Sequence, residues 1–168
     1  HRVRVLHGHF SWRHVSNILE LPPDIPKITW LRDPVERVVS NYFYLSKRLR
    51  EILDEEGRGV NILSKMERSL TEYAQAGINQ NRMSKFLEGL DLEDFRFVGI
   101  VEQMEEDLER LGRRMDWSVK EAYQHNTTGK RKRKITPEER AVIEACNVED
   151  ITLYRRALEL RGTGHWQL

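Results

Sequence analysis

The side chains best suited to bind a ligand lie around the end of an expected strand at 28–31. This strand is a compact β-type run that Arg32 follows directly. Asp33 and Pro34 then have the form of a helix start, with a capping residue and a proline at the first helical position. Ligands of open α/β sheets bind at the carboxyl ends of strands, and helix N-termini attract anions. Arg32 adds a bidentate donor there, and Ser40 lies two helical turns further on. This arrangement predicts a phosphate site; the alternative is that Arg32 pairs with Asp33 while Ser40 faces solvent.

Two histidines form a second group of side chains that could take part in a reaction. His7 and His9 flank Gly8, directly after an alternating run at 2–6. A neutral imidazole titrates near pH 6.5, which suits a general base that removes a proton from a hydroxyl. His9 is therefore a candidate base, although both residues could also be loop histidines without a chemical role. No third ligand lies nearby in the sequence, so we expect no metal site.

A run of five cations interrupts an otherwise acidic chain. The chain has 28 Lys and Arg against 27 Asp and Glu, a net charge of +1. The run consists of Lys130, Arg131, Lys132, Arg133 and Lys134; without it, 23 cations face 27 acids, a net charge of −4. Such a strip predicts a local anion site, and the alternatives are a solvated loop or a nucleic-acid patch. The acidic body and the lack of interleaved aromatic residues argue against nucleic acid.

A polar cluster and a tryptophan are further candidate site residues. Asn79 and Arg82 belong to a polar cluster at an expected helix start, where an ordinary helix cap is the alternative role. Trp12 lies close to His9 in the sequence, so it is the one tryptophan to test for contact with the molecule on which His9 acts; packing in the core or at the surface is the alternative.

Length and composition limit the class of protein. The 168 residues fit one domain, 1–168, and 39% hydrophobic content is enough for a packed core. The apolar runs are far shorter than the roughly 20 residues of a membrane helix. Cys146 is the single cysteine, which excludes a disulfide within the chain. It favours a reducing compartment such as a bacterial cytoplasm, with the Golgi lumen as the alternative.

Strands are expected to alternate with helices along the chain. The pattern predicts strands at 2–6, 28–31 and 95–101, and helices at 11–21, 34–56, 60–76, 79–88, 103–114, 136–146 and 150–161. This alternation indicates an α/β domain, mostly helical, with a small parallel sheet. Three strands are few for such a sheet, so we expect the domain to be incomplete at its N-terminus.

Residues 28–42, Ile-Thr-Trp-Leu-Arg-Asp-Pro-Val-Glu-Arg-Val-Val-Ser-Asn-Tyr, resemble a known nucleotide-binding motif. It is the 3′-phosphate-binding motif of the sulfotransferases that use PAPS (3′-phosphoadenosine-5′-phosphosulfate). The similarity is greatest to the glycan branch, especially the heparan sulfate 2-O-sulfotransferase group and its bacterial relatives. The His-Gly-His of 7–9, the Val-Gly-Ile-Val-Glu of 98–102 and the basic run with Ile-Thr-Pro-Glu at 130–138 resemble further segments of this family, in the same order.

The resemblance implies a P-loop NTPase-like three-layer fold and transfer of a sulfuryl group from PAPS to an acceptor hydroxyl. Adenosine 3′,5′-bisphosphate would be the product and no metal would be required. It implies that Arg32 and Ser40 hold the 3′-phosphate and that the strip containing Lys130, Arg131, Lys132 and Arg133 closes over the nucleotide. It further implies that His9 is the base with His7 in support, and that the acceptor is a carbohydrate. The position of Asn79 and Arg82 resembles a segment on the acceptor side of bacterial relatives.

One family segment is missing from the sequence. The family has a Lys-Thr-Gly-Gly-Thr-like loop for the 5′-phosphosulfate, and no such stretch occurs here. We expect this loop to precede His1 in the natural protein. The alternative functions are a non-catalytic domain that binds a nucleotide or polyanion and, as a third hypothesis, a nucleic-acid-binding module.

Overall fold

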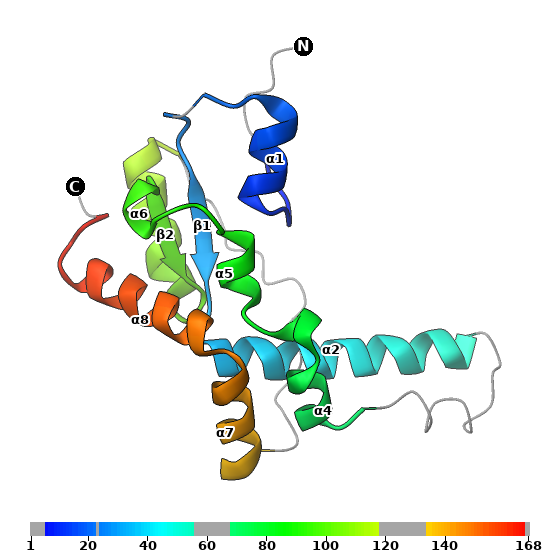
Figure 1. The fold of residues 1–168 in the computed structure, drawn as a ribbon. Helices are drawn as coiled ribbons and strands as arrows, with labels where there is room; N and C mark the ends of the chain where they lie inside the picture. Colours follow the sequence, from blue (N-terminus) through cyan, green and yellow to red (C-terminus); the bar gives the residue numbers. More distant parts are fainter. Residues whose placement is uncertain (1–5, 23, 56–67, 118–133, 167–168) are drawn as a thin grey trace.

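The computed structural model describes residues 6–22, 24–55, 68–117 and 134–166 (Figure 1). Their elements, in chain order, are α1 (Trp12–Leu19), β1 (Ile28–Leu31), α2 (Pro34–Glu55), α4 (Leu70–Gln75), η1 (Gly77–Asn79), α5 (Arg82–Phe86), η2 (Leu92–Asp94), β2 (Phe97–Ile100), η3 (Val101–Gln103), α6 (Met104–Met115), α7 (Pro137–Cys146) and α8 (Val148–Gly162). The chain is therefore mostly helical with a small sheet, which confirms the α/β class expected from the sequence.

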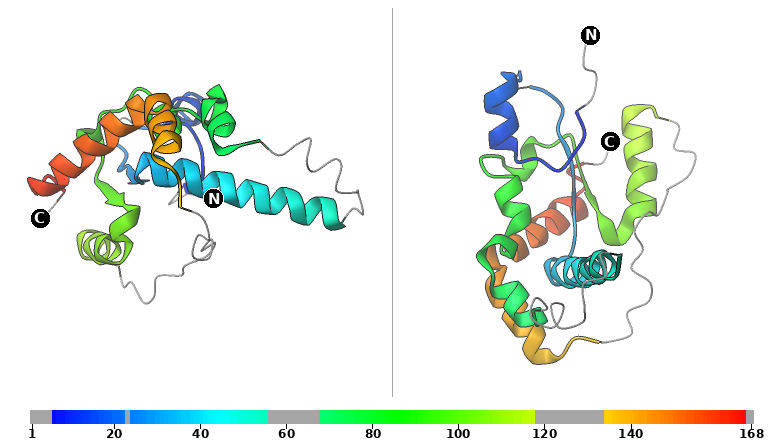
Figure 2. Two further views of the ribbon diagram at one scale, coloured as in Figure 1. Left: turned by 90° about the horizontal axis from the view of Figure 1, so that it is seen from below. Right: turned by 90° about the vertical axis from the view of Figure 1, so that its right-hand side faces the viewer.

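The sheet of the described residues consists of β1 and β2, which run parallel. Ile28 pairs with Phe97 and Leu31 pairs with Ile100, so both strands end at the same edge. Helix α6 packs against β2, and Figure 2 shows α5 and α8 on the other side of the sheet. Helices therefore cover both faces of the sheet, as parallel strands require. Most of the strand expected at 2–6 lies outside the described residues.

The pairing of Trp30 with Gly99 explains a glycine in the middle of a strand. Trp30 lies directly opposite Gly99 in the register. A Cβ atom added to Gly99 would lie 2.3 Å from the Trp30 ring, and real carbon atoms do not approach so closely. Trp30 also packs edge-on against Phe97, with 6.1 Å between ring centroids. The missing side chain of Gly99 thus makes room for an indole that covers the sheet.

Two clusters of buried side chains hold the helices in place. One surrounds the sheet and includes Leu31, Ile100 and Leu111. The other surrounds the first turns of α2 and includes Val38 and Val39, neither of which has any exposed surface. The second half of α2 extends beyond these clusters (Figure 1). The first turns of α2, which follow the strand end, are therefore the most firmly packed part of that helix.

Side-chain caps mark the starts of α2, α4 and α7, while the start of α5 differs from expectation. Asp33 accepts the backbone N–H of Glu36 at 2.8 Å, and Thr136 forms the capping box expected for α7. The helix expected at 79–88 is wrong at its start: α5 begins at Arg82, because 77–79 form a 3₁₀ turn and Asn81 has a φ of +49°. Of the helix expected at 60–76, the described part forms α4.

No helix among the described residues is long and apolar enough to cross a bilayer.

Candidate functional site

A carboxylate and a guanidinium meet where the two parallel strands end. Arg32 follows the last residue of β1, and Glu102 lies two residues after the end of β2. Because Leu31 pairs with Ile100, their side chains emerge at the same edge of the sheet. One oxygen of Glu102, Oε1, lies 4.0 Å from Arg32 Nε and accepts the backbone N–H of Asp33 at 3.0 Å. The other oxygen, Oε2, accepts the hydroxyl of Tyr154 at 3.0 Å.

Tyr154 reaches this edge from the middle of α8. Burial first, and then the negative charge of Glu102, raise the pKa of the Tyr154 phenol far above its ordinary value. Tyr154 is thus a permanent hydrogen-bond donor to Glu102 at any physiological pH.

The start of α2 offers fewer backbone donors than its position suggests. Asp33 already accepts the N–H of Glu36, and Pro34 has no N–H. An anion at this helix end would therefore be bound mainly by side chains rather than by the helix terminus.

Arg32 is the side chain best placed to bind such an anion. Its side chain is 34% exposed, yet its Nε is buried and has no hydrogen-bond partner among the described residues. Ser40 lies on the same helix, half-buried, and no side-chain hydrogen bond connects it to the described part of the chain. The structure therefore leaves both residues of the predicted 3′-phosphate pair available to a ligand.

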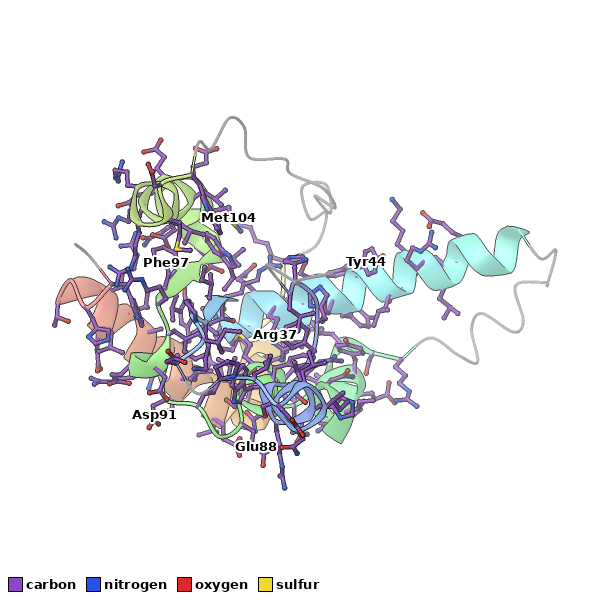
Figure 3. All side chains as sticks on the ribbon, turned by 90° about the horizontal axis from the view of Figure 1, so that it is seen from above. Arg37, Tyr44, Glu88, Asp91, Phe97 and Met104 are labelled. Atoms are coloured by element: carbon purple, nitrogen blue, oxygen red, sulfur yellow. The ribbon has the colours of Figure 1, made fainter. Side chains whose placement is uncertain are left out.

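Arg37, from the same motif, is instead committed to a buried network that the sequence did not indicate. One of its terminal nitrogens, Nη2, donates to the carbonyl of Asn79 and to Oδ1 of Asn147, both at 3.1 Å, and lies 3.5 Å from Asp150. Asp150 has no exposed surface and also accepts the backbone N–H groups of Met83 and Ser84. Figure 3 shows Arg37 near the start of α2, amid packed side chains. This network fixes α2 against the junction of α7 and α8.

The network also determines where the two polar candidates of the 79–82 segment lie. Asn79 is buried and donates its amide to the carbonyl of Tyr73, so its side chain serves the fold and offers no surface to an acceptor. Arg82 lies over the Phe86 ring, 5.5 Å from its centroid. Desolvation lowers the pKa of Arg37 and Asp150 opposes this effect, while the charges of Arg82 and Arg32 lower it further. The charge of Arg37 is thus opposed within the network by the carboxylate of Asp150.

The remaining candidates are not joined to this strand end. His7 and His9 are exposed and form no hydrogen bond or ion pair with the described residues. Trp12 packs under Lys27, 4.9 Å from its ammonium, and Lys27 precedes β1 at the opposite end from Arg32. The four cations Lys130, Arg131, Lys132 and Arg133 lie outside the described residues.

An open groove lies at the opposite end of the sheet. Basic and acidic side chains line it in equal number, with Lys27, Arg96 and Arg114 against Asp24, Glu93 and Asp94. It therefore has no preference for an anion and is separate from the strand end. Within the described part of the chain, no group of three His, Cys, Asp or Glu residues could hold a metal ion.

The sequence indicated Arg32 and Ser40 as a candidate pair, and the family-like segment at 98–102 ends in Glu102. It did not indicate that Glu102 lies beside Arg32. Tyr154 has no sequence signal, because it reaches the site from a helix more than 100 residues away. Comparison of the chain with family models, with curated proteins and with solved structures finds no match.

Proposed function

We propose that this chain is a PAPS-dependent sulfotransferase domain with a three-layer, P-loop-type fold, which transfers a sulfuryl group to a hydroxyl of a carbohydrate. The observation that carries the proposal is the Arg32 to Ser40 motif at a strand-to-helix turn. There, the exposed part of Arg32 lies at the carboxyl end of a parallel strand. Arg32 is the guanidinium offered to an anionic ligand at this edge, since Arg37 is held by Asp150 and by the carbonyl of Asn79.

The candidate nucleotide-binding residues and the two histidines each have a role in such a transfer. PAPS, when bound, supplies the sulfuryl group, which passes to the acceptor oxygen as its bond to the bisphosphate breaks. Arg32 and Ser40 hold the 3′-phosphate and so fix the nucleotide relative to the acceptor. His9 takes the proton of the acceptor hydroxyl, and His7 supports it. The cations at 130–133 neutralise the charge of the nucleotide.

Calorimetric titration with adenosine 3′,5′-bisphosphate tests the proposal. We expect binding that Arg32→Ala weakens by at least about tenfold, since a charge-assisted contact contributes about 1.5–3 kcal/mol. Arg48→Ala is the matched control, because Arg48 is an exposed arginine of α2 that pairs with Glu51, far from the strand end. Absence of binding, or equal losses in the two variants, would overturn the proposal.

A second candidate function is a domain that binds a nucleotide or polyanion without catalysis. It is favoured by His9, which is exposed and forms no hydrogen bond or ion pair with the described residues. A sulfate-transfer assay with PAPS separates the two. Bisphosphate binding without any transfer to glycan acceptors supports the second function, whereas transfer that His9→Ala abolishes supports the first.

A further inference from the structure

We propose that Glu102 and Tyr154 are positioning residues for Arg32, which fix its guanidinium so that its terminal nitrogens face the bound anion. This inference rests on the proposed function and deepens it. It concerns side chains that come from two different elements and that the sequence motif does not include. Glu102, Tyr154 and the backbone N–H of Asp33 are called the Glu102 clasp below.

The clasp holds the Glu102 carboxylate from two sides. Oε1 accepts the N–H of Asp33, which belongs to the turn between β1 and α2, and Oε2 accepts the hydroxyl of Tyr154 from α8. Both distances are 3.0 Å, which is ordinary for a well-formed hydrogen bond. A carboxylate bonded through both oxygens has little freedom to rotate, even though Glu102 is partly exposed.

The fixed carboxylate orients the guanidinium beside it. Arg32 Nε is buried and lies 4.0 Å from Glu102 Oε1, at the limit of an ion pair. The guanidinium is planar, so placing Nε toward Glu102 directs the terminal nitrogens to another side. Those nitrogens form no hydrogen bond within the described residues, although the side chain is 34% exposed. They are left as a two-pronged donor for a phosphate.

The charge of Glu102 makes the sign of the effect informative. A carboxylate near an anion site repels the anion, so a purely competing Glu102 would weaken binding and its removal would strengthen binding. If Glu102 positions Arg32, its removal weakens anion binding. Arg32 can then adopt many rotamers, and binding must restrict them at a cost in conformational entropy. The clasp contacts favour positioning, since they would have no function if Glu102 were only a competitor for Arg32.

The first experiment measures discrimination between two nucleotides. We measure the dissociation constants of both nucleotides and divide that of adenosine 5′-monophosphate by that of adenosine 3′,5′-bisphosphate; a larger ratio means a stronger 3′-phosphate contact. Tyr154→Phe is expected to reduce this ratio about three- to tenfold, the effect of one hydrogen bond. Tyr42→Phe is the matched control, because the Tyr42 hydroxyl also donates one hydrogen bond, to the carbonyl of Arg68, but does not contact the clasp. A purely structural effect would weaken both nucleotides equally and overturn the inference.

Glu102→Ala gives the opposing-sign test in the same assay. The inference requires a lower ratio, whereas a higher ratio would show that Glu102 only competes with the anion. Thermal unfolding of each variant shows whether the protein is folded under the conditions of the titration.

An arm without ligand separates failure of the inference from failure of the proposed function. The Arg32 Nε–H resonance is identified by its loss in Arg32→Lys, and its exchange with solvent is measured in the wild type and in Tyr154→Phe. We expect slow exchange in the wild type and faster exchange in the variant. Unchanged exchange overturns the inference even if the bisphosphate binds. If the clasp behaves as expected but the wild type does not prefer the bisphosphate, the proposed function is wrong, and with it the phosphate-directed part of the inference.

Discussion

Removal of the Asp150 carboxylate should destabilise the domain more than any other single truncation near the strand end. Asp150 has no exposed surface and accepts the N–H of Met83 at 3.2 Å and the N–H and hydroxyl of Ser84 at 2.8 and 2.9 Å. It also lies 3.5 Å from Arg37, whose side chain is only 13% exposed. Asp150→Ala therefore leaves the buried cation of Arg37 without its counter-charge and two backbone donors without their acceptor.

The magnitude follows from these contacts. Removing one partner of a buried ion pair costs about 3–5 kcal/mol, because the remaining charge stays desolvated. Asp150→Asn keeps the shape and one acceptor oxygen, so it should cost less, about 1.5–3 kcal/mol. Glu149→Ala, at the exposed neighbouring position on α8, should stay within about 0.5 kcal/mol of wild type.

Urea unfolding of the single variants and of a double variant measures these differences. Arg37→Met combined with Asp150→Asn should cost less than the sum of the two single losses, by about 0.5–3 kcal/mol, because no unpaired charge is left behind. A loss below about 1 kcal/mol for Asp150→Ala, or strict additivity of the double variant, would refute the argument that the Arg37 network fixes α2.

Three further predictions concern stability and are read from thermal or urea unfolding. Gly99→Ala places a methyl group 2.3 Å from the Trp30 ring, so it should cost about 1–3 kcal/mol, with a change in tryptophan fluorescence as the indole shifts; an unchanged protein would contradict the close packing. Thr136→Ala removes the side-chain acceptor at the start of α7 and should cost about 0.5–2 kcal/mol, whereas Thr136→Ser should restore most of it. Hydrogen bonds from the side chain and then the backbone of Ser69 lower the pKa of Glu72 below 4.5. The stabilisation by Glu72 is thus present above pH 4.5 and is lost as the pH falls through the lowered value, so the gap between wild type and Glu72→Gln should close in acid; a gap independent of pH would contradict this assignment.

The elements with strong local signals were predictable from the sequence. The strand at 28–31, the helix that follows it and the capping box of α7 all occur where their residues indicate. Each depends on neighbours within a few positions, such as a proline at the first helical turn or a threonine three residues before a glutamate. The boundary of α5 was missed for the converse reason. Its start is set by the contacts of Asn81 and Asp150 across 69 positions, which no local pattern reveals.

The candidate site divides in the same way. Arg32 and Ser40 could be proposed as a pair because their spacing along one strand-to-helix turn is local, whereas Tyr154 and Asp150 reach their partners through tertiary packing. Asn79 shows the opposite error, since a polar residue near a helix start suggested a ligand contact. The structure buries it and uses its amide to hold the carbonyl of Tyr73. Polarity in a sequence indicates hydrogen bonding, but only packing determines whether the partner is a ligand or the chain itself.

Arg32 and Arg37 show how far a motif can be divided between binding and folding. They lie five positions apart at one strand-to-helix turn and carry the same group. Arg32 stays partly exposed, whereas Arg37 is enclosed by Asn79 and Asn147, which lie 42 and 110 positions away in the sequence. Loss of activity on changing Arg37 would therefore not identify it as a ligand. The two roles separate when binding is measured per folded molecule: Arg37→Lys should lower the unfolding free energy while the surviving folded protein keeps its preference for the bisphosphate. Arg32→Lys should lose that preference at unchanged stability, because an ammonium cannot reproduce the two-pronged contact of a guanidinium.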